Sequence, residues 1–245
     1  MRRTQGFTLL ELVVIIAVLG ILAAAVAPTV MNEIMDTRVS ATRDEARGLY
    51  GAMVGAPASS GTSFGFVGDI GRLPTSLAEL ATQGGLPSFA TGNIRSIGMG
   101  WRGPYINSGT SANDYQRDAF GRVYVLNSGQ VRSYGNDGIA NNTDDIVYPP
   151  SAPAVTGTVA ITVKTISGGK TVVDPANYRV DLYYANSGVQ AVVSDAASPF
   201  TFSGVPMGLH AVRVIKTAAP NAGSTMVEDT VVVRPVTTNA AELWF

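Results

Sequence analysis

The chain has 245 residues, which is enough for one large domain or two domains of ordinary size. Its 17 basic and 18 acidic side chains nearly cancel, so the sequence carries no strong electrostatic footprint for nucleic acid. Cysteine is absent, which excludes disulfides, thiolate metal sites and cysteine nucleophiles.

The first segment of the chain is apolar over residues 7–27, apart from Thr8 and Glu11. A helix of this length rises about 30 Å, which is roughly the hydrocarbon thickness of a bilayer. Arg2 and Arg3 precede it, with no acidic residue among the first six, so the positive-inside rule places the N-terminus in the cytoplasm. We therefore predict one membrane-spanning helix, with the rest of the chain outside.

Glu11 is an unusual residue for a membrane-spanning helix. A carboxylate there costs on the order of 2.5–3.5 kcal/mol at the centre and less toward an end, so we expect Glu11 to have a partner. An ordinary secretory signal is the alternative, but its apolar region is only about 7–15 residues long. The longer run of residues 7–27, with a carboxylate near its beginning, favours a permanent helix.

The run GFTLLELVVIIAVLGILAAAVAP resembles the class III leader and N-terminal helix of type IV pilins and type II secretion pseudopilins. The resemblance implies that a membrane prepilin peptidase cleaves between Gly6 and Phe7, removing residues 1–6, and that Phe7 is then N-methylated. It also implies that Glu11 neutralises the terminal amine of Phe7 in a neighbouring copy, because each charge alone is costly in an apolar bundle.

Pro28 and Gly20 match positions where helices of this family kink or loosen, since a proline removes a backbone hydrogen bond. We expect one helix over residues 7–56. Side chains that recur at three- and four-residue steps are expected to face a globular domain as core residues: Met31, Ile34, Met35, Val39, Thr42, Ala46, Leu49 and Met53.

Residues 57–148 alternate short strand-like runs with Gly, Asn and Pro, which predicts a small antiparallel sheet packed on the long helix. Two blocks in this region are WRGPY (residues 101–105) and DAFGRVY (residues 118–124). They resemble the WxGPY and DPWGxPY signatures of the major, G-type pseudopilin of type II secretion. Ala119 and Phe120 stand where the second signature has proline and tryptophan.

The segment SYGNDGIANNTDD, residues 133–145, concentrates oxygen donors and is called the acidic loop below. Its spacing does not fit the EF-hand pattern, and by itself it indicates either a solvated turn or a cation site. The resemblance to G-type pseudopilins implies a structural calcium ion bound by Asp137, Asp144 and Asp145 and by the backbone carbonyl of Tyr134. Three carboxylates in one loop would repel each other without a cation, so we expect the ion to hold the loop against the sheet.

The closely spaced prolines of residues 149–153 predict a linker. Beyond them, residues 154–245 alternate apolar and polar side chains with period two, which predicts a small β-sandwich of transthyretin-like or immunoglobulin-like type. Typical G-type pseudopilins lack such an extension. His210 is the only histidine and is interpreted as an ordinary strand residue, because one histidine without cysteine cannot build the usual zinc site.

The sequence therefore predicts an α+β fold, in which a long N-terminal helix packs on a small antiparallel sheet and a separate all-β sandwich follows. The serines have no evident base-and-orienter set, so we do not expect an enzyme. Three functions remain open: a subunit of a type II secretion pseudopilus or type IV pilus-like filament, a surface-displayed type IV pilin whose sandwich serves adhesion or decoration, and a membrane-tethered ligand-binding protein.

The resemblance also implies partners and a location. The partners are other copies of the chain, minor pilins or pseudopilins, the prepilin peptidase and the inner-membrane assembly platform, and no nucleic acid is expected. The chain would lie in the bacterial inner membrane before assembly and in a periplasmic pseudopilus or cell-surface filament afterwards.

Overall fold

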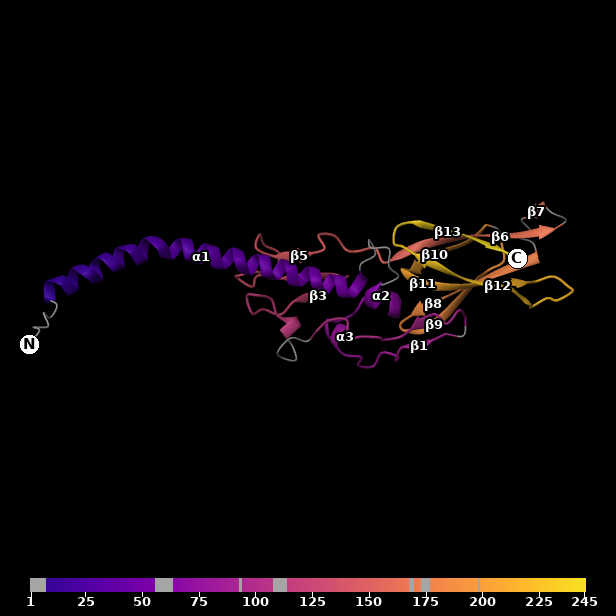
Figure 1. The fold of residues 1–245 in the computed structure, drawn as a ribbon, viewed down its shortest axis with the longest axis horizontal. Coiled ribbons are helices and arrows are strands. Elements are labelled where there is room, and N and C mark those ends of the chain that lie inside the picture. Colours follow the sequence, from indigo (N-terminus) through magenta and orange to yellow (C-terminus); the bar gives the residue numbers. More distant parts are fainter. Residues whose placement is uncertain are drawn as a thin grey trace, which may run out of the picture.

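The computed structural model describes residues 8–55, 64–92, 94–107, 114–167, 170–172, 177–197 and 199–245. The fold is α+β, as the sequence predicts, with a long N-terminal helix, small antiparallel sheets in the middle and larger sheets at the C-terminal end. These parts follow one another along the long axis of the molecule, so the free end of the helix and the C-terminal sheets lie at opposite ends (Figure 1).

The helices of the described residues are α1 (Leu9–Val54), α2 (Gly65–Ile70), α3 (Ala78–Ala81) and the 3-10 turn η1 (Asp114–Gln116). The strands of the middle part are β1 (Ala90–Thr91), β2 (Gly98–Met99), β3 (Val125–Asn127), β4 (Gln130–Ser133) and β5 (Ile146–Tyr148). The strands of the C-terminal part are β6 (Thr156–Ser167), β7 (Lys170–Val172), β8 (Tyr178–Asn186), β9 (Val189–Asp195), β10 (Phe200–Pro206), β11 (Gly208–Lys216), β12 (Thr225–Val233) and β13 (Thr238–Trp244).

The helix α1 is continuous despite the proline inside it. It begins after Thr8, whose side-chain oxygen accepts the backbone N–H of Glu11 at 3.2 Å and so satisfies one of the free donors of the first turn. It ends at Gly55, whose φ is 72° and whose backbone N–H donates to the carbonyl of Gly51 at 2.7 Å. Pro28 removes one hydrogen bond from the helix interior, and α1 curves along its length (Figure 1).

Other elements cover only the C-terminal part of α1. Its buried residues are Thr42, Ala46, Leu49, Met53 and Val54. Met35 and Val39 are half-buried. Met31 and Ile34, which belong to the same predicted stripe, are 60% and 42% exposed. The prediction that these two residues face the globular part is therefore wrong, because the elements that pack on α1 begin further along the helix.

A three-stranded antiparallel sheet in the order β3-β4-β5 packs against the covered part of α1. Burial alternates along β4, where Val131 and Ser133 are fully buried, so one face of the sheet belongs to the core. The core residues are Ala46, Leu49, Met53, Val54, Phe64, Phe66, Val67, Ile70, Leu77, Leu80, Tyr124, Val131 and Met207. The predicted packing of the long helix on a small antiparallel sheet is confirmed.

The C-terminal part consists of two sheets around a second core. One sheet has the order β10-β6-β13, with β7 paired to β6, and the other has the order β12-β11-β8-β9. β13 runs parallel to β6, whereas the other pairs are antiparallel. The second core consists of Val159, Ile161, Val163, Val180, Leu182, Phe200, Phe202, Val205, Val212, Val214, Val231, Val233 and Leu243. Period-two alternation thus buries one face of each sheet, as predicted.

The junction between the two parts is closely packed. Met207, between β10 and β11, is 1% exposed and belongs to the core formed by α1 and the small sheet. Gly71 lies so close to β8 that an added Cβ would come within 1.8 Å of the carbonyl oxygen of Ala185. The backbone N–H of Gly188 donates to the carbonyl of Ile70 at 2.8 Å. These contacts fix the orientation of the C-terminal sheets, which the sequence analysis did not foresee.

A second attachment involves the segment between β1 and β2. Ile94 and Ile97 are buried against Ala211 of β11 in a small apolar cluster. Arg95, beside them, lies 3.8 Å from a carboxylate oxygen of Asp229 in β12. The middle part of the chain therefore holds the sheet β12-β11-β8-β9 at two separate places.

Candidate functional site: the exposed helix and the acidic loop

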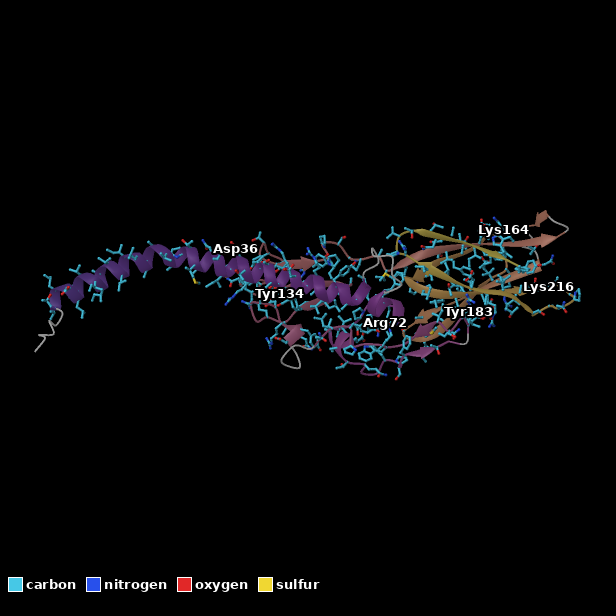
Figure 2. All side chains as sticks on the ribbon, viewed as in Figure 1. Asp36, Arg72, Tyr134, Lys164, Tyr183 and Lys216 are labelled. Carbon is cyan, nitrogen blue, oxygen red and sulfur yellow. The ribbon has the colours of Figure 1, made fainter. Side chains whose placement is uncertain are left out.

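The N-terminal half of α1 is an apolar helix that no described element covers. Among the described residues, α1 is the one helix long and apolar enough to cross a membrane, and none of its most apolar stretch is buried. Its exposed large apolar side chains in this half are Leu9, Leu10, Leu12, Val13, Val14, Ile15, Ile16, Val18, Leu19, Ile21, Leu22, Val26 and Val30. They project to all sides of the ribbon (Figure 2). A helix that is apolar all round is suited to a membrane or to a bundle of similar helices.

Glu11 is the one acidic residue within Leu9–Val30. Its backbone N–H is bonded to Thr8, and its side chain is exposed. Gly6 and Phe7 lie outside the described residues. The predicted cleavage between them, and the contact of Glu11 with the amine of a neighbouring copy, therefore stay predictions.

The block DAFGRVY begins with a buried aspartate that forms the turn of the block. Asp118 is 5% exposed, and its Oδ1 accepts the backbone N–H groups of Phe120 at 2.9 Å and Arg122 at 2.8 Å. Its Oδ2 accepts the hydroxyl of Ser133, at the start of the acidic loop. The carboxylate of Asp118 thus stabilises the turn of the DAFGRVY block and connects this turn to the acidic loop by a hydrogen bond.

The end of the same block contacts α1. Tyr124 donates its hydroxyl to Oε2 of Glu45 at 2.7 Å. Burial, together with the neighbouring carboxylate of Glu45, raises the pKa of Tyr124 well above its usual value. The backbone N–H of Ala119 donates to Oγ1 of Thr42, also on α1, at 3.3 Å. The block therefore connects the long helix to the acidic loop.

The WRGPY block surrounds a buried carboxylate. The hydroxyl of Tyr105 and Nε of Arg102 donate to Oδ2 of Asp69 at 2.9 Å and 3.2 Å. Asp69 is 7% exposed, and burial raises its pKa although Tyr105 and Arg102 act in the opposite direction. Nε1 of Trp101 donates to the carbonyl of Glu79 at 2.7 Å. The polar atoms of this block are thus used in packing α2 and α3.

Two of the predicted calcium ligands in the acidic loop accept hydrogen bonds within the loop. Oδ2 of Asp144 accepts the backbone N–H groups of Asn136 at 2.9 Å and Asp137 at 3.2 Å. Oδ1 of Asp137 accepts the backbone N–H of Ile139, and its Oδ2 accepts the side-chain amide of Asn142, both at 2.8 Å. The structure therefore places Asp144 against the backbone of Asp137, with both carboxylates turned toward N–H donors.

The other two predicted calcium ligands, Asp145 and Tyr134, differ in whether their oxygen atoms already accept hydrogen bonds. Oδ2 of Asp145 accepts the backbone N–H of Asn141 at 2.8 Å and lies 3.5 Å from Nη1 of Arg132. Its Oδ1 is buried and has no hydrogen-bond partner among the described residues. The carbonyl of Tyr134 accepts the backbone N–H of Gly138 at 2.9 Å. Asp145 Oδ1 is thus a buried acceptor that is free to take a further donor or a cation.

Two arginines supply positive charge around the acidic loop. Arg122 donates from Nε to the carbonyl of Gly135 at 2.9 Å and from Nη2 to the carbonyl of Asn136 at 2.5 Å. Arg132 donates to Oδ1 of Asn141 at 2.7 Å. Both arginines precede the acidic loop in the chain, and nothing in the sequence predicted that they contact it.

The donor chemistry of the loop fits a hard cation, because its side chains offer oxygen atoms and Asp145 Oδ1 accepts no hydrogen bond from any described residue. The geometry fits less well. Among the described residues, no group of three His, Cys, Asp or Glu side chains is arranged to hold a metal ion. Asp137 and Asp144 would have to exchange hydrogen bonds for the ion. Calcium binding at this loop stays a prediction.

Comparison with known proteins identifies the N-terminal segment. Residues 1–27 match the family model described as the prokaryotic N-terminal methylation motif. Together with the uncovered apolar helix, this match defines the class: the chain carries the N-terminal methylation motif of type IV pilins and pseudopilins, with an additional C-terminal β part. The motif implies a prepilin anchored in the inner membrane and processed by prepilin peptidase. Proteins of this class are generally structural and non-enzymatic.

The other two comparisons add less. The comparison with curated proteins found no match. Among solved structures, the chain is similar to a crystal structure from Pseudomonas aeruginosa that is described as a candidate carbohydrate-binding protein. The two are 16% identical, the match covers 40% of this chain and 94% of that chain, and the TM-score is 0.27. At this TM-score the likeness supports no conclusion about fold or ligand.

Proposed function

We propose that the chain is a structural subunit of a type II secretion pseudopilus or of a type IV pilus-like filament, and that it polymerises through the N-terminal half of α1. The observation that supports this proposal is the stretch Leu9–Val30, which is apolar and uncovered, yet continuous with a helix that is packed into a folded part. Such a surface is stable in a bilayer before assembly and in a bundle of identical helices afterwards.

In this proposal the membrane is only the first environment of the helix. Prepilin peptidase removes residues 1–6 and Phe7 is N-methylated. Minor pilins or pseudopilins and an inner-membrane assembly platform then place the subunit in the filament. The N-terminus faces the cytoplasm before assembly, and the folded parts lie outside the membrane throughout.

The C-terminal sheets would be carried on the outside of the filament in one fixed orientation. The packing of Met207 into the first core and the close approach of Gly71 to Ala185 support this, because a sheet held by such contacts cannot swing freely. Every subunit would therefore present the same β surface to its surroundings. In a surface pilin, that surface would serve adhesion.

Mass spectrometry of the protein purified from its own membrane tests the processing step. We expect a mature chain that begins with methylated Phe7. A chain that retains Met1 under conditions in which its assembly machinery is active contradicts the proposal.

The role of Glu11 is tested with the variant Glu11→Ala, with Asp44→Ala as the matched control. Asp44 is also an exposed acid on α1, but it lies beyond the apolar stretch. We expect Glu11→Ala to insert into the membrane normally and to form far fewer filaments, because the terminal amine of the neighbouring copy loses its counter-charge. Wild-type filament numbers from Glu11→Ala would show that the assigned role is wrong.

The type of filament is decided by deletion and microscopy. Loss of exported proteins after deletion of the gene indicates a pseudopilus. Long surface fibres built from this chain, seen by electron microscopy, indicate a pilus whose β part is displayed for adhesion. A lone monomer in every assembly-active condition would instead indicate a membrane-tethered binding protein.

The predicted calcium ion is part of this proposal and is tested separately. Asp145 Oδ1 supports it, since a bound cation would compensate this buried acceptor. Calorimetry of the chain in detergent should detect calcium binding, and Asp145→Asn should weaken it strongly. No binding heat, together with no change in melting temperature on adding a chelator, would exclude a structural ion here.

A further inference from the structure

Beyond its apolar half, α1 carries a row of polar and charged side chains on one exposed side. The row, called the charged stripe below, consists of Glu33, Asp36, Ser40, Arg43 and Arg47. Steps of three and four residues place these positions one above another along the helix. All of them are exposed, and they continue the uncovered part of α1 into the region whose other side is buried.

The charges of the stripe are separated by sign along the helix. The two acids, Glu33 and Asp36, lie nearer the apolar half, and the two arginines follow after Ser40. Asp36 lies where the free part of α1 reaches the folded part (Figure 2). The stripe is therefore acidic at one end and basic at the other.

Three of the four charged side chains of the stripe have no ion-pair partner among the described residues. Glu33, Asp36 and Arg43 form no ion pair with any other described residue. Arg47 has two contacts within the subunit: its guanidinium lies over the Tyr148 ring, 5.6 Å from the ring centre, and its Nη1 lies 3.8 Å from Asp44 in an ion pair whose side chains are both mostly exposed. The separation of unpaired charge creates a surface that is complementary to a shifted copy of itself.

We propose that the charged stripe is a contact surface between neighbouring copies of this chain, in which the basic end of one stripe lies against the acidic end of the next. The inference rests on the proposed filament function and adds the register of the subunits. A shift of seven residues places Asp36 of one copy level with Arg43 of the other, which is about 10 Å along parallel helices. A shift of zero would place acid against acid and arginine against arginine.

The direction of this shift agrees with the contact predicted for the N-terminus. A copy displaced toward the C-terminal end of its neighbour brings its own Asp36 to the neighbour's Arg43. The same displacement brings its terminal amine toward the neighbour's Glu11, which is four residues, about 6 Å, along the helix from Phe7. The difference of about 5 Å between the two spacings is within the reach of long side chains such as those of Arg and Glu.

An antiparallel pair would also bring opposite charges together. It would, however, place the two N-termini at opposite ends, whereas copies inserted with the same topology enter the assembly from the same side. The parallel, shifted arrangement is the one that both the charges and the membrane topology permit.

Charge reversal in cells that carry the assembly machinery tests the proposal. Asp36→Arg and Arg43→Asp are each expected to reduce the yield of sheared filaments about fivefold or more, because an attractive surface pair becomes a repulsive one. The double variant Asp36→Arg/Arg43→Asp should restore most of the yield. Arg38→Asp is the matched control, since Arg38 is exposed on another side of α1, and its yield should stay at the wild-type level.

Cysteine cross-linking gives the register directly, because the natural chain contains no cysteine. Asp36→Cys/Arg43→Cys should form a ladder of disulfide-linked oligomers in filaments, whereas Asp36→Cys alone should stay monomeric. Linking of Asp36→Cys to itself would show an unshifted arrangement and overturn the proposal.

The two proposals fail in different ways. Wild-type filaments with unchanged yields in both single reversals would overturn the charged-stripe contact and leave the filament function standing. Absence of any filament from the wild-type chain in assembly-active cells would overturn the filament function and the stripe contact with it.

Discussion

His210 is the residue whose protonation is expected to change the stability of the C-terminal part most strongly. It lies in β11, is 1% exposed, and its Nε2 is 2.6 Å from the carbonyl oxygen of Pro206. A carbonyl only accepts, so Nε2 carries the hydrogen and Nδ1 is a bare acceptor, which is buried and has no partner in the part of the chain that the structure describes. Burial lowers the pKa of His210 to about 4, although the Pro206 carbonyl acts in the opposite direction.

Acidification should therefore destabilise the protein through this one side chain. In the unfolded chain the pKa of histidine is about 6.5, so below that pH the unfolded state takes up a proton that the folded state does not. The stabilising contribution is complete above pH 6.5 and is lost progressively as the pH falls toward 4. The difference between the two pKa values corresponds to a loss of about 3 kcal/mol by pH 4 and about 1 kcal/mol by pH 5.5, relative to pH 7.

The assay compares the native chain with His210→Gln in detergent. Glutamine does not titrate and can still donate to the Pro206 carbonyl, and the other titrating groups, including buried Asp69, are common to both chains. Urea unfolding at pH 7, 5.5 and 4 gives the free energy of unfolding of each. We expect the difference between the two chains to change by about 3 kcal/mol from pH 7 to pH 4, and a constant difference would refute the assigned pKa.

Three further substitutions test the packing by urea unfolding of the full chain. Met207→Ala should lower the free energy of unfolding by about 2–5 kcal/mol by leaving a cavity in the first core, whereas Met226→Ala, at a position 37% exposed, should cost less than about 1 kcal/mol. Gly71→Ala should cost about 2 kcal/mol or more, because its φ is 83° and the added Cβ meets a backbone carbonyl, whereas Gly223→Ala has a similar φ in open space and should cost about 1 kcal/mol. Asp118→Ala should cost about 1–3 kcal/mol by leaving backbone N–H groups without an acceptor.

Specific outcomes would contradict these expectations. Equal effects of Met207→Ala and Met226→Ala would mean that the C-terminal sheets are not anchored in the first core. Equal effects of Gly71→Ala and Gly223→Ala would show that the backbone of Gly71 does not lie close to β8. An unchanged stability of Asp118→Ala would show that the turn of the DAFGRVY block forms without its aspartate.

The sequence predicted the elements that depend on local patterns. The apolar run of residues 7–27 predicted the uncovered helix. Its side chains are apolar on every side, so the helix has no polar face that could be turned to water. Period-two alternation predicted the C-terminal strands, and the expected end of the long helix at residue 56 lies within two residues of its end at Val54. The extent of the covered stripe was overestimated, because periodicity shows which side of a helix is apolar but not how far a partner reaches along it.

The candidate site was predicted less completely. The sequence identified Glu11 and the three aspartates of the acidic loop as residues that need partners, because carboxylates are costly when they are buried or crowded. It could not show that Arg122 and Arg132 lie around that loop, or that Asp145 keeps one buried oxygen unpartnered. Those facts depend on how β4, β5 and the turn after Asp118 are placed in space.

By itself, the sequence determined the class of the N-terminal segment, the membrane-length helix and the alternating strands of the C-terminal part. These features can be recognised from the sequence because each is a pattern among neighbouring residues. Only the tertiary structure decided that Met207 belongs to the core of the other part, that Gly71 and Ala185 touch, and that His210 is buried with one nitrogen unsatisfied. The first two features join residues far apart in the chain, and the burial of His210 depends on elements packed around it. Their free energies depend on distances and burial that no local pattern contains.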